Sequence, residues 1–182
     1  GGAGFDRLNG NSADNDLTLT GLNEGTLDKV SFSNIENIYL QEGNDKVTIE
    51  NGGGLSGLLD GGKGNNTLIV DNHPITIDKD GKIIIGNGGG SGGGSYKNFQ
   101  NIEGINSGNQ TNKITLNSNS NNVSITGPNS GTVDGTAFTN ISDIDLAAGD
   151  DNATISSTGS LSGTLKGGEG TDDLFLNNSD NV

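Results

Sequence analysis

A long internal repeat runs through this sequence without a gap. Residues 25–70 align with residues 131–176 at a constant offset of 106 residues, so that Phe32 matches Phe138 and Gly64 matches Gly170. The match extends upstream, where Leu17 and Leu19 meet Val123 and Ile125. Two copies of one pattern are expected to adopt the same local structure, and repeats of this kind bury their apolar faces by stacking on their neighbours.

A third, partial copy lies between the two long ones. Residues 99–105 match residues 32–38, and residues 112–116 match residues 45–49, both at an offset of 67. The chain begins and ends inside repeat motifs, which predicts a segment of a longer array. We expect a single solenoid domain with the following internal repeats: about 8–72, 73–121 (partial) and 122–182 of residues 1–182.

Short apolar clusters recur roughly every ten residues along the chain. They are rich in β-branched residues and are bounded by Gly, Asn or Asp, a pattern typical of strands joined by turns. No convincing helical period of 3.6 residues is present. The sequence therefore predicts an all-β protein. The gapless repeat favours a right-handed parallel β-helix (a β-solenoid), with a β-sandwich as the alternative, and a narrow core suits a chain that is only 28% hydrophobic.

Two stretches interrupt the regular pattern of the middle copy. In residues 75–85, two apolar triplets flank Asp-Lys-Asp-Gly-Lys, which predicts a β-hairpin that protrudes from the solenoid or pairs at its edge. Residues 88–95 read GGGSGGGS, and two perfect Gly-Gly-Gly-Ser units match a flexible synthetic linker. Residues 87–95 are therefore interpreted as an engineered linker that replaces a native loop, with a natural flexible loop as the alternative.

The charge of the chain narrows its range of partners. The formal net charge is −14, and no cluster of Lys and Arg offers the counterion release on which nucleic-acid binding depends. The same charge disfavours an anionic membrane surface, and the sequence has no apolar run of about 18 residues that would cross a membrane. The absence of cysteine excludes disulfides and thiolate metal sites. The composition fits a secreted or surface protein that meets divalent cations.

A compound motif recurs in both long copies. It begins with F-x-N-I at Phe32 and Phe138, continues through a Gly-Asn-Asp or Gly-Asp-Asp turn and a strand, and ends with L-S-G-x-L-x-G-G-x-G. This pattern resembles the repeats of very large bacterial exoproteins, including filamentous haemagglutinin-type and related surface adhesins. The resemblance implies a parallel β-helix that serves as a segment of a cell-surface or secreted fibre.

Glycine-rich nine-residue motifs occur at three places in the chain. Residues 1–9 and 167–175 fit G-G-x-G-x-D-x-U-x, where U is apolar, and residues 61–69 fit it with Asn66 in place of the aspartate. The motif resembles the calcium-binding nonapeptide of repeats-in-toxin proteins, and this resemblance implies calcium ligands at Asp6 and Asp172. In that family the nonapeptides follow one another in tandem, whereas here they are separate. The interpretation that we favour is a solenoid corner with a solvated aspartate.

Two further aspartates are candidate calcium ligands. Asp45 and Asp151 close equivalent turns, and their carboxylates are the hard oxygen ligands that calcium prefers, although such triplets are more often plain turns. Catalysis is not expected. The only histidine, His73, precedes Pro74 and has no cysteine or second histidine as a partner. Aromatic platforms for sugars are few, and an active site would break the repetition.

Threonine occupies the centre of five short apolar triplets, at Thr18, Thr48, Thr76, Thr115 and Thr154. Period-2 alternation turns each of them away from the core, and a flat array of outward threonines would be typical of an ice-binding solenoid. The alternative is that threonine favours strands and solvates their outer face.

Taken together, these patterns predict a structural or adhesive segment of a large secreted bacterial cell-surface protein. Its expected partners are neighbouring repeats of the same protein, or copies assembled end to end, together with a glycan or protein on a host or cell surface. The main alternative is a calcium-dependent surface-layer or extracellular matrix protein that forms filaments, with calcium as its cofactor. Ice binding is a minor alternative.

Overall fold

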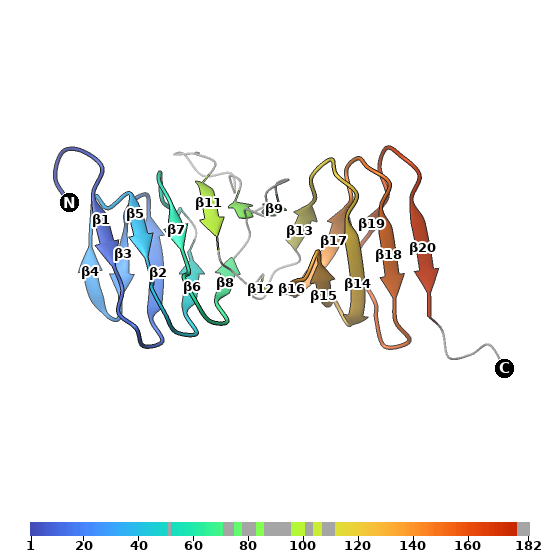
Figure 1. Cartoon of the computed structure of the whole chain (residues 1–182), viewed down its shortest axis with the longest axis horizontal. Coiled ribbons are helices and arrows are strands. Elements are labelled where there is room, and N and C mark those ends of the chain that lie inside the picture. Colours follow the sequence, from blue (N-terminus) through green and yellow to red (C-terminus); the bar gives the residue numbers. More distant parts are fainter. Residues whose placement is uncertain are drawn as a thin grey trace.

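The computed structural model describes residues 1–50, 52–70, 75–77, 83–85, 96–100, 104–106 and 112–177. Within these residues the chain forms strands and no helix, so the prediction of an all-β protein is confirmed. None of them belongs to a helix that could span a membrane. The strands form one nine-stranded and one eleven-stranded open sheet. Figure 1 shows an elongated molecule with β4 and β1 near one end and β20 at the other.

The strands of the nine-stranded sheet come from every part of the chain. In spatial order they are β1 (Arg7–Asn9), β5 (Asn37–Tyr39), β7 (Leu59–Asp60), β11 (Tyr96–Gln100), β10 (Ile83–Ile85), β9 (Ile75–Ile77), β13 (Asn112–Thr115), β17 (Ile141–Asp145) and β19 (Leu165–Lys166).

The eleven-stranded sheet runs along the same axis. In spatial order from the N-terminal end its strands are β4 (Val30–Phe32), β3 (Glu24–Leu27), β2 (Asp16–Gly21), β6 (Lys46–Ile49), β8 (Thr67–Val70), β12 (Gly104–Asn106), β16 (Thr136–Thr139), β15 (Ser130–Val133), β14 (Asn122–Gly127), β18 (Asn152–Ile155) and β20 (Asp173–Leu176).

Parallel pairing joins strands that are far apart in sequence. In the nine-stranded sheet, Leu8 lies beside Ile38 and Ile38 beside Leu59. In the eleven-stranded sheet, Leu17 lies beside Val47 and Val47 beside Leu68. The chain thus returns to each sheet once per coil.

The coils come in two lengths. We call the step from Leu17 to Val47 the long coil and the step from Val47 to Leu68 the short coil. The same two steps recur in the second repeat copy, between β13, β17 and β19 in one sheet and between β14, β18 and β20 in the other. The repeat in the sequence is therefore a repeat in the structure.

The long coil owes its extra length to an antiparallel meander. Strand β2 pairs with β3, and β3 with β4, all within the eleven-stranded sheet; β14, β15 and β16 repeat this arrangement. The turns of the first meander place Asn23, Asp28 and Lys29 at positive φ, a conformation that asparagine and aspartate tolerate better than most residues. Each meander adds two strands to one sheet without adding any to the other.

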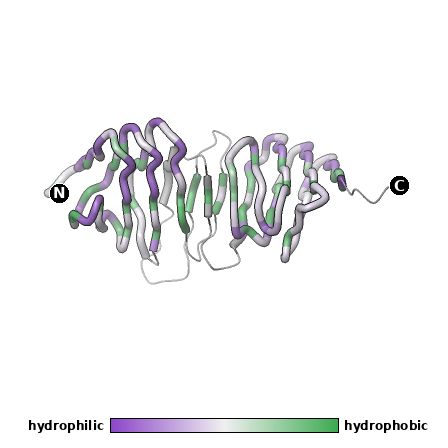
Figure 2. Tube along the Cα trace, turned by 90° about the horizontal axis from the view of Figure 1, so that it is seen from below, coloured by the Kyte–Doolittle hydropathy of each residue, from purple (hydrophilic) through white to green (hydrophobic). Residues whose placement is uncertain are grey.

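One continuous hydrophobic core lies between the two sheets. Alternate residues of the strands point into it, as in the pattern of β6, where Val47 and Ile49 are fully buried while Thr48 is only partly covered. Residues from both sheets belong to the same cluster, for example Ile38 and Leu59 from one and Leu17 and Leu68 from the other. Figure 2 shows hydrophilic residues at many of the bends between strands.

The molecule divides into two equivalent units and a connecting piece. We call residues 7–70 the N-terminal unit (β1–β8), residues 75–106 the junction (β9–β12) and residues 112–176 the C-terminal unit (β13–β20). Each unit supplies three strands to the nine-stranded sheet and five to the eleven-stranded sheet. The junction supplies three strands to the nine-stranded sheet and one to the eleven-stranded sheet. One unit and one junction together therefore add six strands to each sheet.

The predicted hairpin forms, but its position differs from the expectation. Ile83 pairs with Ile77 and Ile85 with Ile75 in antiparallel register; the turn residues between them lie outside the described part of the chain. Instead of protruding or lying at an edge, β9 and β10 occupy the middle of the nine-stranded sheet, between β13 and β11. The four isoleucines are buried because their alternating side chains belong to the core.

Candidate functional site

The most distinctive polar feature is a row of buried Asn and Asp side chains at one corner of the coils. In the N-terminal unit the row consists of Asn15, Asp45 and Asn66, which are 2%, 1% and 0% exposed. The backbone N–H of Asn15 donates to Oδ1 of Asp45 (2.7 Å), and the N–H of Asp45 donates to Oδ1 of Asn66 (2.9 Å). The side chains of Asp45 and Asn66 thus each accept a hydrogen bond from the preceding coil. We call this row the N-terminal Asx ladder.

The C-terminal unit contains the equivalent row, the C-terminal Asx ladder, formed by Asn121, Asp151 and Asp172. The N–H of Asn121 donates to Oδ1 of Asp151 (2.7 Å), and the N–H of Asp151 donates to Oδ1 of Asp172 (3.2 Å). Asn121 and Asp151 are buried, while Asp172 lies on the last coil and is exposed. Side-chain hydrogen bonds therefore reinforce the contact between successive coils in both units.

A second set of side chains bonds the coils in the opposite direction. The N–H of Asn44 donates to Oδ1 of Asp14 (2.7 Å), and the N–H of Asn65 donates to Oδ1 of Asn44 (3.0 Å). The N–H of Thr171 donates to Asp150 in the same way. Because the ladder residues Asn15, Asp45 and Asn66 each follow a member of this set, adjacent residues of one corner clamp the coil to its neighbours.

Two ladder carboxylates have an unusual second oxygen. Within the described residues, Oδ2 of Asp45 and Oδ2 of Asp151 are buried and have no hydrogen-bond partner. On the preceding coil the corresponding atom is an amide nitrogen: Nδ2 of Asn15 donates to the carbonyl of Ala13, and Nδ2 of Asn121 donates to the carbonyl of Asn119. The carboxylate oxygens therefore stand where the preceding coil has a hydrogen-bond donor.

Burial raises the pKa of the Asp45 carboxyl above its usual value. Desolvation is the main cause, and the nearby charges of Asp14 and Asp28 act in the same direction, while the hydrogen bond from the Asn15 backbone opposes them. The neutral acid has an O–H that satisfies the need for a donor, and a bound cation would relieve the same oxygen of its unpaired charge. The buried corner thus favours the neutral form of the Asp45 carboxyl.

The structure distributes the four predicted calcium ligands over different environments. Asp151 and Asp172 meet in the C-terminal Asx ladder, and Asp45 lies in the N-terminal one. Asp6 precedes β1 and closes its own glycine-rich turn, since its Oδ2 accepts a hydrogen bond from the N–H of Gly2 (2.6 Å). Among the described residues there is no group of three or more His, Cys, Asp or Glu side chains arranged to hold a metal.

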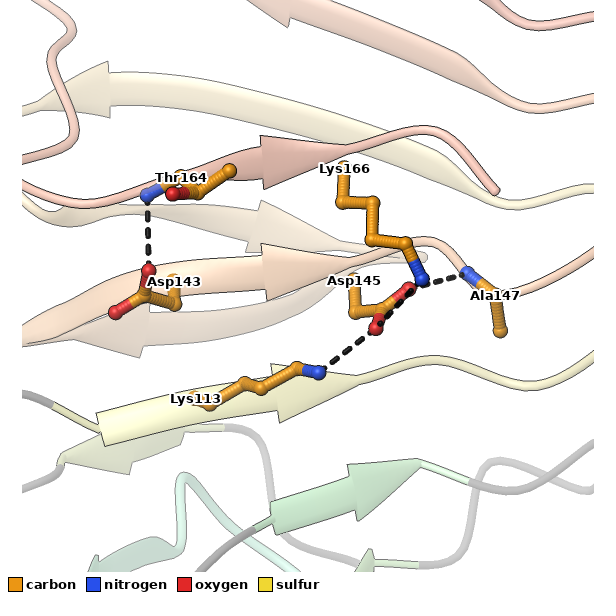
Figure 3. A network of polar contacts seen from close by, with 6 residues as sticks. All are labelled: Lys113, Asp143, Asp145, Ala147, Thr164 and Lys166. Carbon is orange, nitrogen blue, oxygen red and sulfur yellow. Dashed lines mark hydrogen bonds and ion pairs between the residues drawn. The ribbon is translucent and has the colours of Figure 1, made fainter.

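A charge cluster on the outer face of the nine-stranded sheet was not anticipated from the sequence (Figure 3). Asp145 on β17 lies between Lys113 on β13 and Lys166 on β19, and its Oδ2 is 2.7 and 3.5 Å from the two Nζ atoms. The hydrogen bond from Lys113 is the main reason why the pKa of Asp145 is lowered, although desolvation opposes it. The two lysines remain half-exposed or more, so each ion pair adds little to stability.

The equivalent cluster in the N-terminal unit uses different chemistry. The matching positions of the first repeat copy hold Arg7, Tyr39 and Asp60, and the guanidinium carbon of Arg7 lies 3.9 Å from the centre of the Tyr39 ring. A cation–π contact replaces the ion pair, with an acid in place of the second lysine. Both units therefore place a cation at this position, but they give it a different partner.

The five threonines do not form one array. Thr18 lies beside Thr48 in the eleven-stranded sheet, but Thr76 lies beside Thr115 in the nine-stranded sheet. Thr154 has Ser124 on one side and Phe175 on the other, and Thr48 is followed by Ile69. The row Ser31, Thr26, Thr18 and Thr48 is instead a continuous run of hydroxyls, and it ends there.

Two features singled out in the sequence belong to other parts of the chain. His73 and the predicted linker at residues 87–95 lie outside the described residues.

Asparagine in place of Asp45 is expected to stabilise the protein near neutral pH by about 1–3 kcal/mol, because the amide supplies the missing donor. The raised pKa means that the folded state holds a proton to higher pH than the unfolded state. The wild-type protein therefore loses stability as the pH rises from about 4 through the folded pKa. The stability gap between Asp45→Asn and wild type should close on acidification.

Chemical denaturation of both proteins between about pH 3.5 and 7.5 measures this gap. Asp134→Asn is the control, because Asp134 lies in the C-terminal unit, is exposed and already accepts a hydrogen bond from the N–H of Asn122. A variant that is less stable than wild type at neutral pH in the absence of divalent cations would contradict the assignment of an unpaired acid to Asp45.

The chain was compared with protein-family models, with curated proteins and with solved structures. No protein-family model matches the chain. Neither the curated proteins nor the solved structures contain a match.

Proposed function

We propose that the chain is a non-catalytic structural segment of a large secreted bacterial surface protein, folded as a right-handed parallel β-helix. Its role is mechanical and adhesive. It extends and stiffens a surface fibre and presents an acidic exterior to a glycan or protein on another surface. Neighbouring repeats of the same protein are its closest partners.

The bonding between coils is the observation that carries this proposal. Every coil of each unit is joined to the next by parallel strand pairs in both sheets, and the Asx ladders add further bonds at the corners. Because strands in a sheet bond perpendicular to their own direction, these bonds run along the long axis of the molecule (Figure 1). A load applied between the two ends is carried by the same bonds that hold the coils together.

The β-helix is favoured over a sandwich by the path of the chain. Outside the meanders and the junction hairpin, successive strands alternate between the two sheets, as β5, β6, β7 and β8 do. A sandwich built from Greek-key or meander connections would place mainly antiparallel neighbours in each sheet. The alternating long and short parallel steps fit coils of a solenoid, in which the long coil carries an inserted meander.

The location outside the cell is supported by composition. A net charge of −14 and the absence of cysteine suit a repeat protein that stays soluble in a medium containing divalent cations. An elongated acidic rod also resists association with itself along its sides, since like charges repel.

Stretching single molecules between cysteines introduced at Ser12 and Asn177 tests the mechanical role, because the chain has no cysteine of its own. Coils that bear the load in series should detach one after another. The expected releases are about 75 Å for a short coil and about 105 Å for a long coil. Attachment at Ser12 and Glu42, on adjacent coils, is the control and should release one long coil. A single all-or-none extension of the whole chain would refute the proposed load path.

The unpaired oxygens of Asp45 and Asp151 favour a second candidate function, that of a calcium-dependent surface-layer or matrix protein. Calcium would replace the missing donors and stiffen the corners of the coils. Thermal melting with calcium and with a chelator should then show a higher melting temperature in calcium for wild type. The double variant Asp45→Asn/Asp151→Asn should show none of this shift. Equal melting temperatures of wild type in both solutions would exclude this candidate.

A further inference from the structure

The two ends of the molecule expose residues that are buried elsewhere in the same structure. Leu174 and Leu176 on β20 are 55% and 64% exposed, whereas their equivalents on β8, Leu68 and Val70, are fully buried. At the other end, Val30 on β4 is 70% exposed. Phe32 is only partly buried, while its equivalent Phe138 is 1% exposed. Equivalent residues of the two repeat copies are thus exposed at the ends of the molecule and buried in its middle.

The junction is what covers these positions in the middle of the molecule. Ile105 on β12 lies between Leu68 of the N-terminal unit and Phe138 of the C-terminal unit. Ile75 on β9 lies beside Ile114, the equivalent of the partly buried Leu8. Both faces of the junction are therefore complementary to the two faces that the ends of the molecule expose.

The N-terminal face is also hollowed between the sheets. A surface groove of about 310 Å³ is lined mainly by residues of β1, β3 and β4, with Leu8, Leu27, Val30 and Phe32 as its apolar wall. The equivalents of these residues in the C-terminal unit lie on the side of the junction, and Ile114, Val133 and Phe138 among them are buried. The apolar wall that the junction covers in the C-terminal unit thus borders an open groove in the N-terminal unit.

The number of strands that a unit adds to each sheet disfavours direct stacking of one unit on another. A unit contributes two more strands to the eleven-stranded sheet than to its partner, so units stacked without a junction would make one sheet longer by about 10 Å per unit. A unit with a junction extends both sheets by six strands, or about 29 Å. The two sheets then grow by the same length along the axis.

We infer that each end of this molecule binds a junction-type polypeptide segment, which adds one parallel strand to the eleven-stranded sheet and three strands to the nine-stranded sheet. The recognised chemistry is a strand with an isoleucine-like side chain seated against Leu174 or Phe32, and the outer edges of β20 and β4 supply its pairing partners. The inference rests on the structural role proposed above, and names the partner that such a role requires.

A lengthened chain tests the inference. Residues 71–176, one full period, are inserted a second time between Leu176 and Asn177, so that a second junction follows β20. Backbone amide hydrogen exchange of β20 should slow by at least about tenfold, toward the rates of β8 in the same molecule. The control carries Ile105→Asp in the inserted copy only, and its β20 amides should exchange as they do in the unextended chain.

Three results would overturn the inference. The first is unchanged exchange at β20 while the amides of the inserted unit are protected. The second is equal protection of β20 in the extended chain and in the control. The third is formation of dimers or filaments by the unextended chain with β20 protected, which would make a second copy the partner. Stepwise release in the stretching experiment is independent of all three, so the mechanical role can stand when the junction inference fails.

Discussion

Replacing Leu68 by alanine is expected to lower the free energy of unfolding by about 2–5 kcal/mol, whereas the same replacement at Leu174 should change it by less than about 0.5 kcal/mol. The two leucines occupy equivalent positions of the two repeat copies, on β8 and β20. Leu68 is fully buried between neighbouring coils, and its loss leaves a cavity. Leu174 is 55% exposed, so less surface returns to water.

Urea unfolding of the two variants measures the difference. Leu68→Met, a change that nearly conserves volume, serves as the control and should cost less than about 1.5 kcal/mol. Equal losses at Leu68 and Leu174 would mean that the C-terminal face is already covered in solution, which contradicts the exposed edge described above.

Alanine at Gly64 should destabilise the protein by more than about 3 kcal/mol, and alanine at Gly4 by about 1–2 kcal/mol. Both glycines hold the fourth position of a glycine-rich nonapeptide, and their φ values are similar, +129° and +121°. A methyl group at Gly64 would lie 1.8 Å from the carbonyl oxygen of Gly43 on the preceding coil, whereas one at Gly4 would have no atom within 4 Å. Comparing the two variants therefore separates two contributions to the loss of stability. Both include the cost of a positive φ, and only Gly64→Ala includes the steric clash with the neighbouring coil.

Thermal and urea unfolding of the two variants give the comparison, with wild type alongside. Gly170→Ala provides an independent check, because its methyl group would lie 2.0 Å from the carbonyl oxygen of Gly149. A Gly64→Ala protein as stable as Gly4→Ala would show that the glycine is retained only for its φ angle. The expected result assigns the glycine-rich motif a packing role in this chain, irrespective of any ion.

Strand positions could be predicted from the sequence because the signals are local. Alternation around Val47 and Ile49 indicates a half-buried strand, and turn residues at Gly43 to Asp45 mark its beginning. The hairpin pairing of β9 with β10 follows from its two apolar triplets. In each case neighbouring residues carry the information, so a single chain is sufficient.

The assignment of strands to sheets could not be predicted. Residues 99–105 match residues 32–38, yet Ile38 belongs to the nine-stranded sheet and its match Ile105 to the other. Alternation states only which side chains point inward, and both sheets face the same core. Sequence similarity at this offset therefore identifies strands of the same kind in different sheets.

The antiparallel meanders were missed although the second copy contains a signal for them. Asp134-Gly135 is a dipeptide typical of tight hairpin turns, and it joins β15 to β16. In the first copy the equivalent residues are Asp28 and Lys29, which adopt positive φ without the help of a glycine. The repeat comparison could have transferred the signal from one copy to the other.

The charge cluster at Asp145 depends on information that lies outside any local window. Lys113 and Lys166 are distant from Asp145 in sequence, and only the pairing register brings them to one carboxylate. The buried Asx ladders could be predicted only in part. Their turns were recognised, but the unpaired oxygens of Asp45 and Asp151 became visible only with the neighbouring coils in place.

The equal growth of the two sheets has a consequence for insertions and deletions in this chain. Losing the strands β3 and β4 would shorten the eleven-stranded sheet by two strands, and losing the hairpin strands β9 and β10 would shorten the other by two. Either deletion alone changes the difference in length between the sheets, whereas both together preserve it. Two segments that are distant in sequence and lie in different sheets are thus coupled in length, so changes in one are expected to be tolerated only when the other changes with it.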